Sequence, residues 1–241
     1  MKKLDTLLKK RKTIAFLDLE GTQLTHEIIE IGLVKVTLNP DNSIKKEYKG
    51  LKLYVLPKSH VGSVVTHLTG ITDSLVKKEG IHYSEAISKI KGYMGEDYEK
   101  CIFMVYGNQD AAMFINTYKK NTETNFEDSR FLASRCIDMS KFFQNYFSGK
   151  NGNPISLEKL CENLEVKYRG KAHDALTDAF ALLDCYKAFL SKPDLVKKNY
   201  KLSLSEKTNY PYSIRRVINE LNNGNIVTPE QFEEFISGDL K

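Results

Sequence analysis

Two carboxylates at the end of a predicted strand are the first residues whose types and spacing suit chemistry. The apolar segment 13–18 predicts a buried strand, and Asp18 and Glu20 end it. Side chains two residues apart on a strand point to the same face, so these carboxylates lie side by side and repel each other. Taken alone, the pair is consistent with two solvated surface acids as well as with a functional site.

Asp110 occupies a comparable position after another short apolar run, residues 101–106. In α/β sheets the carboxyl ends of the strands carry the functional sites, and Asp110 comes just beyond such an end. The same residue also suits the N-cap of the helix that we expect over residues 111–118. Asp110 is therefore a further candidate for a functional-site residue, and the alternative is a purely structural role as a helix N-cap.

His173 and Asp178 stand at the start of a long apolar segment, residues 174–190. The segment predicts a helix that is buried on almost all sides, with Asp174 as its N-cap. A carboxylate one turn into such a helix is costly unless it is paired, binds a metal or faces a cleft. A cleft at the start of the helix places His173, on the entering loop, beside Asp178.

The segments between these residues predict an α/β domain. After the first strand, residues 28–38 and 48–56 predict two more strands, separated by a turn at 39–42, which together indicate an antiparallel meander. From residue 84 onward strands alternate with helices, as is typical of parallel strands. The further elements we expect are a helix over 84–98 with Ser84 as N-cap, a strand over 135–138, a helix over 139–147 and a helix from Ser156 to Leu164.

The C-terminal residues predict a helical hairpin over residues 213–237. Apolar residues recur at helical spacing from Ile214 to Leu221. Thr228 then suits an N-cap, with a proline after it and Gln231 as its capping-box partner. We expect these apolar stripes to pack against the main domain, although a cover for the cleft or a dimer contact also fits.

The net charge of the chain is concentrated in a short arm. The 241 residues include 36 Lys and Arg against 31 Asp and Glu, a formal net charge of +5, and residues 1–12 account for this excess. A nearly neutral body argues against a protein that coats nucleic acid with a broad basic face. We expect a basic arm (1–12), a main domain (13–190) and a helical extension (191–241), the arm being a short amphipathic helix or a tail that contacts phosphates.

Composition excludes several classes of protein. Hydrophobic content of 41% and charged content of 28% are ordinary for a globular protein. The longest stretch without Asp, Glu, Lys or Arg is residues 59–72, 14 residues, whereas a membrane span needs roughly 18 apolar ones. The four cysteines form no CxxC pair, which favours reduced thiols in a cytoplasmic protein over a zinc site or a disulfide framework.

The order of the candidate residues resembles the DEDDh branch of the DnaQ-like 3′–5′ exonucleases. A strand ending in Asp-x-Glu, a second strand leading to Asp, and a helix opened by His-x4-Asp follow in the order of that family. Three further segments are similar to family segments: HEIIEIG at 26–32, LTGIT at 68–72 and SLEKLCENL at 156–164. The resemblance covers about residues 13–190.

The resemblance implies a fold, an activity and cofactors. The fold is α/β, a ribonuclease H-like mixed sheet in which an antiparallel meander joins parallel strands, flanked by helices. The activity is hydrolysis of the 3′-terminal phosphodiester of single-stranded RNA or DNA to 5′-nucleoside monophosphates. The cofactors are two divalent cations, Mg²⁺ or Mn²⁺.

The resemblance also implies the roles of individual residues. Asp18, Glu20, Asp110 and Asp178 are the metal ligands. His173 is the general base on the attacking water. The substrate-binding residues are Gly21, Thr22, Gln23 and Leu68, with Leu68 as a wedge against the terminal base or an ordinary core residue.

Departures from the family pattern leave the preference for RNA or DNA open. The first motif often continues with two threonines and a glycine, where this chain has GTQ at 21–23, and Gln109 stands where an aromatic residue often precedes the second-motif Asp. The segments YRG at 168–170 and IDMSK at 137–141 are most similar to Eri-type RNA exonucleases and KapD-type proteins. Two other functions stay open: hydrolysis of very short oligonucleotides, and a regulatory module that only binds nucleic acid.

Overall fold

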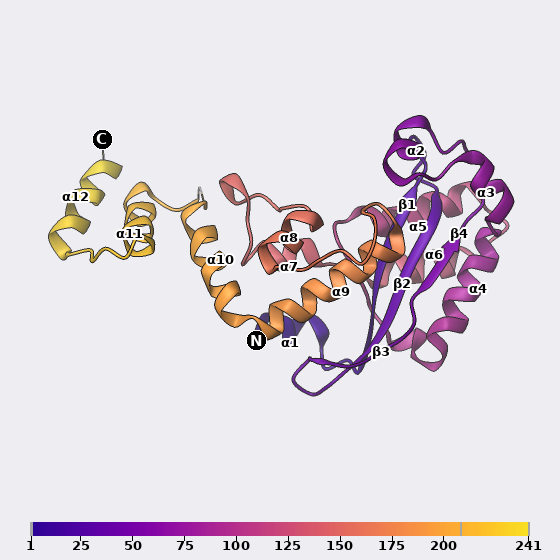
Figure 1. Ribbon diagram of the computed structural model, residues 1–241, viewed down its shortest axis with the longest axis horizontal. Helices are drawn as coiled ribbons and strands as arrows, with labels where there is room; N and C mark the ends of the chain where they lie inside the picture. Colours follow the sequence, from indigo (N-terminus) through magenta and orange to yellow (C-terminus); the bar gives the residue numbers. More distant parts are fainter. Residues whose placement is uncertain (1, 208, 241) are drawn as a thin grey trace. The chain divides into compact units, whose positions relative to one another are not determined.

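The computed structural model describes residues 2–207 and 209–240, and the chain divides into two compact units (Figure 1). The first unit runs to Met139 and includes Val166–Lys187, and the second comprises Ser140–Glu165 and the residues from Ala188 onward. The expected division into residues 1–12, 13–190 and 191–241 stays a prediction.

The described strands all belong to the first unit and form one mixed sheet. They are β1 (Thr13–Gly21), β2 (Ile28–Leu38), β3 (Ile44–Glu47), β4 (Leu51–Tyr54), β5 (Phe103–Val105) and β6 (Cys136–Asp138). The strand order is β3-β2-β1-β5-β6, and β4 also pairs with β2. β2 is antiparallel to β1, β3 and β4, whereas β5 is parallel to β1 and β6. This arrangement confirms the predicted α/β class and its mixed sheet.

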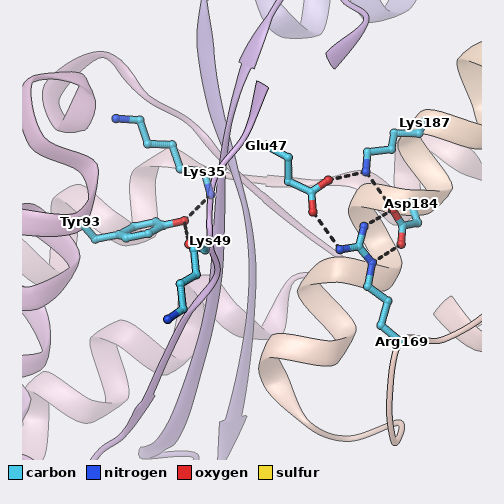
Figure 2. Close-up of polar contacts among 7 residues, drawn as sticks. All are labelled: Lys35, Glu47, Lys49, Tyr93, Arg169, Asp184 and Lys187. Atoms are coloured by element: carbon cyan, nitrogen blue, oxygen red, sulfur yellow. Dashed lines mark hydrogen bonds and ion pairs between the residues drawn. The ribbon is translucent and has the colours of Figure 1, made fainter. Parts of the chain in front are cut away.

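The strand predicted over residues 48–56 is longer than the one observed, because only β4 lies within this range. The pairing of β3 with β2, directly before it, was not predicted. Glu47 lies opposite Val36 and Leu51 opposite Leu33, so three residues face two on β2. Such an extra residue interrupts regular pairing. The hydroxyl of Tyr93 bridges the interruption, accepting from the N–H of Lys35 and donating to the carbonyl of Lys49, both at 2.9 Å (Figure 2).

Helices cover both faces of the sheet. Those of the first unit are α1 (Lys2–Leu8), α2 (Ser63–Thr69), α3 (Asp73–Glu79), α4 (Tyr83–Met94), α5 (Gln109–Lys120), α6 (Phe126–Arg135) and most of α9 (Ala175–Ser191). On one face Leu17 and Leu19 of β1 share a buried cluster with residues of α4, α5 and α6. On the opposite face the Phe16 ring contacts the Tyr186 ring of α9, with centroids 5.6 Å apart.

Two helix starts in the first unit refine the sequence predictions. His82, not Ser84, is the N-cap of α4. Tyr83 is buried and its hydroxyl bonds Ser129 in α6, which draws Tyr83 into the first turn and places Ser84 inside the helix. The basic arm begins as a helix, α1, that buries Leu4 and Leu8, so the amphipathic alternative is the one observed.

The second unit is helical over the residues that the structure describes. It contains most of α7 (Met139–Phe143), α8 (Leu157–Leu164), α10 (Pro193–Ser205), α11 (Tyr212–Asn222) and α12 (Pro229–Asp239). Ser156 caps α8 and Thr228 forms the predicted capping box with Gln231. α11 and α12 form the predicted hairpin, in which Ser213 donates to Asp239. Ile214 and Leu221 remain 37% and 56% exposed, so this apolar stripe is not fully buried.

Among the described residues no helix is both long and apolar enough to cross a bilayer.

Candidate active site

The two acids that end β1 project from one face of the strand, as predicted. They alternate with leucines that are buried in the core. Asp18 lies opposite Gly32 of β2, and Glu20 lies opposite Glu30. The register shifts between Glu20 and Gly21, so regular pairing ends directly after the acids.

The start of α9 brings His173 and Asp178 together. Asp174 is the N-cap, as predicted, because its Oδ1 accepts a hydrogen bond from the Thr177 N–H at 3.0 Å. One turn into the helix, Oδ2 of Asp178 accepts a 3.0 Å hydrogen bond from the backbone N–H of His173. His173 has a φ of 61°, in the left-handed region, which turns the loop into the helix and leaves its side chain exposed.

The geometry around Asp178 fits a bound cation. Side-chain donor atoms of Glu20, His173 and Asp178 all lie within 4.8 Å of one another. Asp178 is only 8% exposed, and its Oδ1 has no hydrogen-bond partner among the described residues. A buried oxygen without a donor is costly unless a cation satisfies it. Carboxylate oxygens are the ligands that hard divalent cations prefer.

Asp110 joins the acids of β1 from a different element. It lies in the first turn of α5 and is 5% exposed, and the backbone of Leu19, between Asp18 and Glu20, partly offsets the rise in its pKa by hydrogen bonding. The N-cap of α5 is Asn108, so the structural alternative for Asp110 is wrong. Burial raises the pKa of Asp110 to about 7.

The electrostatics show that the predicted acids crowd one another. Burial raises the pKa of Asp18 well above its usual range, and the charges of Asp110, Asp178 and Glu20 raise it further. Burial, followed by the charge of Asp178, raises the pKa of Glu20 to about 8. Burial raises the pKa of Asp178 to about 6, although hydrogen bonds from His173 and Tyr168 oppose the shift. Like charges held out of water favour protonation or a bound cation.

Glu30 and Lys52 support the site, and the sequence analysis did not single them out. Glu30 is 1% exposed, and its Oε2 accepts a 2.8 Å hydrogen bond from the backbone N–H of Ala175, the first residue of α9. Its Oε1 lies 2.8 Å from Nζ of Lys52, which also pairs with Asp174. A buried acid between two isoleucines of a strand was the available signal in the sequence, since such a group requires partners.

Gly32 allows the start of α9 to lie directly on the sheet. A Cβ added to Gly32 would lie 2.1 Å from the carbonyl carbon and oxygen of Ala175, which is far inside van der Waals contact. Because Gly32 is opposite Asp18, this close approach brings the helix that carries Asp178 to the strand that carries Asp18. Glycine is needed here for space rather than for its backbone freedom.

Arg169 fastens the loop that leads to His173 (Figure 2). Its guanidinium donates two 2.7 Å hydrogen bonds to Asp184 of α9 and one of 2.8 Å to Glu47 of β3. Lys187 contacts both of these carboxylates. Bidentate pairs of this kind fix orientation as well as charge, so the loop is held to the body of α9.

The predicted substrate residues lie at the end of β1 and on α2. A Cβ on Gly21 would lie 2.5 Å from Cε of Met113. Thr22 is 1% exposed, and its Oγ1 accepts from the N–H of Glu27. Gln23 accepts from the N–H of Val64 in α2, the helix on which Leu68 is 45% exposed. Exposure of Leu68 argues against an ordinary core residue, and the substrate roles stay predictions.

A mixed sheet with buried carboxylates gathered from β1, α5 and α9 is the arrangement of a nuclease of ribonuclease H-like fold. The sequence model of the Exonuclease (RNase_T) family matches residues 15–186. The chain therefore belongs to this family and is an exonuclease, which confirms the DEDDh, DnaQ-like resemblance. This family uses divalent metal ions. A search of curated proteins gave no match.

Solved structures of nucleases share the fold. The nuclease domain of 3′hExo, a DEDDh family member bound to rAMP, is 19% identical with a TM-score of 0.60, covering 75% of this chain and 92% of that chain. Cell-death related nuclease 4 (CRN-4) is 18% identical with a TM-score of 0.60, covering 76% and 64%. E. coli Exonuclease I in complex with a dA16 oligonucleotide is 18% identical with a TM-score of 0.56, covering 81% and 44%.

Proposed function

We propose that the protein hydrolyses the terminal phosphodiester at the 3′ end of single-stranded nucleic acid and releases 5′-nucleoside monophosphates. The observation that carries the proposal is the convergence of Asp18, Glu20, Asp110 and Asp178, whose pKa values are all raised. Crowding of buried acids lowers stability without a cation. A binding module has no need of such a cluster.

The four acids would hold two divalent cations, Mg²⁺ or Mn²⁺. When bound, such ions neutralise phosphate charge and supply an activated water. Asp18 has all three other acids close enough to raise its pKa, which supports a role for it as a ligand shared by the ions. The unpartnered Oδ1 of Asp178 offers a further ligand.

His173 would accept the proton of the attacking water. Imidazole is the side chain that changes charge nearest to neutral pH, which suits a general base. The backbone N–H of His173 is held by Asp178, while its exposed side chain is open to solvent water. The loop therefore fixes the main chain and leaves the ring free to reach a substrate.

The strand end and α2 would receive the terminal nucleotide. Gly21, Thr22 and Gln23 follow the acids directly, and Leu68 offers an exposed apolar surface to a base. Related folds have been solved with rAMP and with dA16, which supports both RNA and DNA as substrates.

End-labelled single- and double-stranded RNA and DNA, each incubated with Mg²⁺ or Mn²⁺, test the proposal. We expect single strands to shorten from the 3′ end with release of 5′-monophosphates. A chain-length series separates this activity from hydrolysis of very short oligonucleotides. Binding without products from any of the four substrates would instead support a regulatory module.

A further inference from the structure

A pocket of about 640 Å³ lies beside residues 10–12, where β1 begins, at the opposite end of this strand from the acids. We call it the basic pocket. The residues that line it include Asp5, Lys10, Arg11, Lys12, Asn42 and Lys45. We propose that the basic pocket binds backbone phosphates of the single strand whose 3′ end lies at the acids. This inference rests on the proposed function.

The side chains that line the basic pocket carry an excess of positive charge. Four cationic side chains line it against one carboxylate, and Oδ1 of that carboxylate, Asp5, accepts a 2.7 Å hydrogen bond from Asn42. Within residues 2–207 and 209–240, Lys10, Lys12 and Lys45 take part in no ion pair. Unpaired cations around a concave surface focus positive potential and attract anions.

One wall of the pocket is held in a strained conformation. Lys9 and Lys10 have φ values of 47° and 58°, in the left-handed region that residues other than glycine seldom adopt. The N–H of Lys9 donates to the carbonyl of Asp5 at 2.9 Å, and that of Arg11 donates to the carbonyl of Leu8 at 3.0 Å. Strain of this kind persists where the surroundings impose it and often marks functional sites.

The other wall is equally fixed. Asn42, in the turn between β2 and β3, is 8% exposed and has a φ of 68°. Its carbonyl accepts a 2.7 Å hydrogen bond from the hydroxyl of Tyr186 in α9. Lys45 follows in β3. The basic side chains therefore extend from anchored backbone on both walls, which lowers the entropy cost of ordering the pocket when a ligand binds.

The distance to the acids favours a strand over a free nucleotide. Six residues separate Lys12 from Asp18 along β1, which corresponds to about 20 Å at roughly 3.4 Å per residue. A terminal nucleotide held at the acids does not reach the pocket. Only a strand of several nucleotides spans this distance. A basic pocket at this range thus suits the upstream part of a longer strand.

The test uses the full chain with Lys10, Lys12 and Lys45 replaced together by Gln. Binding of a fluorescent single strand of about 20 nucleotides is measured in EDTA over a salt series, so that no cleavage occurs. Each phosphate contact contributes about 0.7 to the slope of log affinity against log salt, so loss of three contacts makes the slope shallower by about 2. The matched control replaces Lys49, Lys119 and Lys120, exposed lysines outside the pocket, by Gln.

The outcomes separate this inference from the proposed function. We expect the pocket variant alone to show the shallower slope and to retain wild-type turnover of a trinucleotide, which also shows that it is folded. An unchanged slope of log affinity against log salt in the pocket variant, or the same change of slope in the control variant, overturns the proposal that the basic pocket binds the strand. Loss of AMP binding with an unchanged slope for the long strand shows a free-nucleotide site and also overturns it. A wild-type chain that binds but cuts neither oligonucleotide contradicts only the proposed function.

Discussion

Oε2 of Glu30 accepts a 2.8 Å hydrogen bond from the backbone N–H of Ala175. Glu30 lies opposite Glu20 in the sheet, and Ala175 begins the helix that carries Asp178. The bond therefore joins two elements that each contribute an acid. It also satisfies one of the N–H groups that the start of a helix leaves unpaired.

Replacement of Glu30 by Ala should lower both stability and turnover. It leaves the buried N–H of Ala175 without an acceptor, at a cost of about 2 kcal/mol in the free energy of unfolding. It also loosens the start of α9, so we expect kcat to fall more than KM rises. Urea unfolding and steady-state kinetics measure the two effects, with the exposed Glu85→Ala as control. Normal kcat in a destabilised Glu30 variant would show that Glu30 has no positioning role.

Replacement of Gly32 by Ala should reduce activity through the position of α9. The new Cβ would overlap the carbonyl group of Ala175, so the helix start must move. We expect a loss of roughly 1–3 kcal/mol of stability and a large loss of kcat. Gly92→Ala is the matched control, because Gly92 lies in α4 with no atom within 4 Å of the added Cβ, and it should gain up to about 1 kcal/mol. Equal turnover in the two variants would contradict this role of Gly32.

The stability of the metal-free chain should fall as the pH rises. The pKa of Glu20 is raised to about 8 and that of Asp178 to about 6, so the folded chain binds more protons than the unfolded chain from about pH 4 to pH 8. The stability that these groups contribute is fully present below the unfolded pKa values, about 4, and is lost as the pH rises through the folded ones. We expect the Tm in EDTA to drop between pH 5 and pH 8.

Divalent cations should reverse this trend. They compete with protons for the acids, so Mg²⁺ should raise the Tm more at pH 8 than at pH 5. Thermal unfolding at both pH values, with and without Mg²⁺, measures the difference. The same Mg²⁺-induced increase at both pH values would contradict binding at the acids.

The His173→Ala variant should separate binding from turnover. Loss of a general base typically costs about 100-fold or more in kcat, while the acids and their ions remain. We expect single-strand affinity to stay near the wild-type value. His82→Ala is a suitable control, because His82 is exposed and its side chain makes no capping bond. Wild-type turnover of the His173 variant would remove this residue from the mechanism.

The sequence located the acids because motif order and strand ends are local features. Asp18, Glu20 and Asp110 each follow a recognisable apolar segment, and Asp178 stands at the start of one. Their convergence depends on contacts between distant segments, such as the hydrogen bond between the backbone of Leu19 and Asp110. Glu30, Gly32 and Arg169 were missed as site residues for the same reason, since their partners lie far along the chain.

Other elements were missed because their local signals were weak. α2 (SVVTHLT) has β-branched residues and no side-chain N-cap bond, so its sequence does not favour a helix. The strand expected over residues 48–56 is confined to β4, which begins directly after Gly50. A Cβ there would lie 2.5 Å from Leu176, so packing against α9, rather than strand propensity, decides this segment.

The Asp18→Asn variant gives the most direct measurement of the proposed chemistry. A 5′-labelled single strand is incubated in Mg²⁺ with wild-type chain, Asp18→Asn and the exposed-turn control Asp41→Asn, and product lengths and released monophosphates are followed. We predict stepwise 3′ shortening with wild type and control and none with Asp18→Asn. The variant should also have a higher Tm than wild type in EDTA, because one crowded charge is gone. If the Asp18→Asn variant released 5′-monophosphates at the wild-type rate, hydrolysis at these acids would be contradicted.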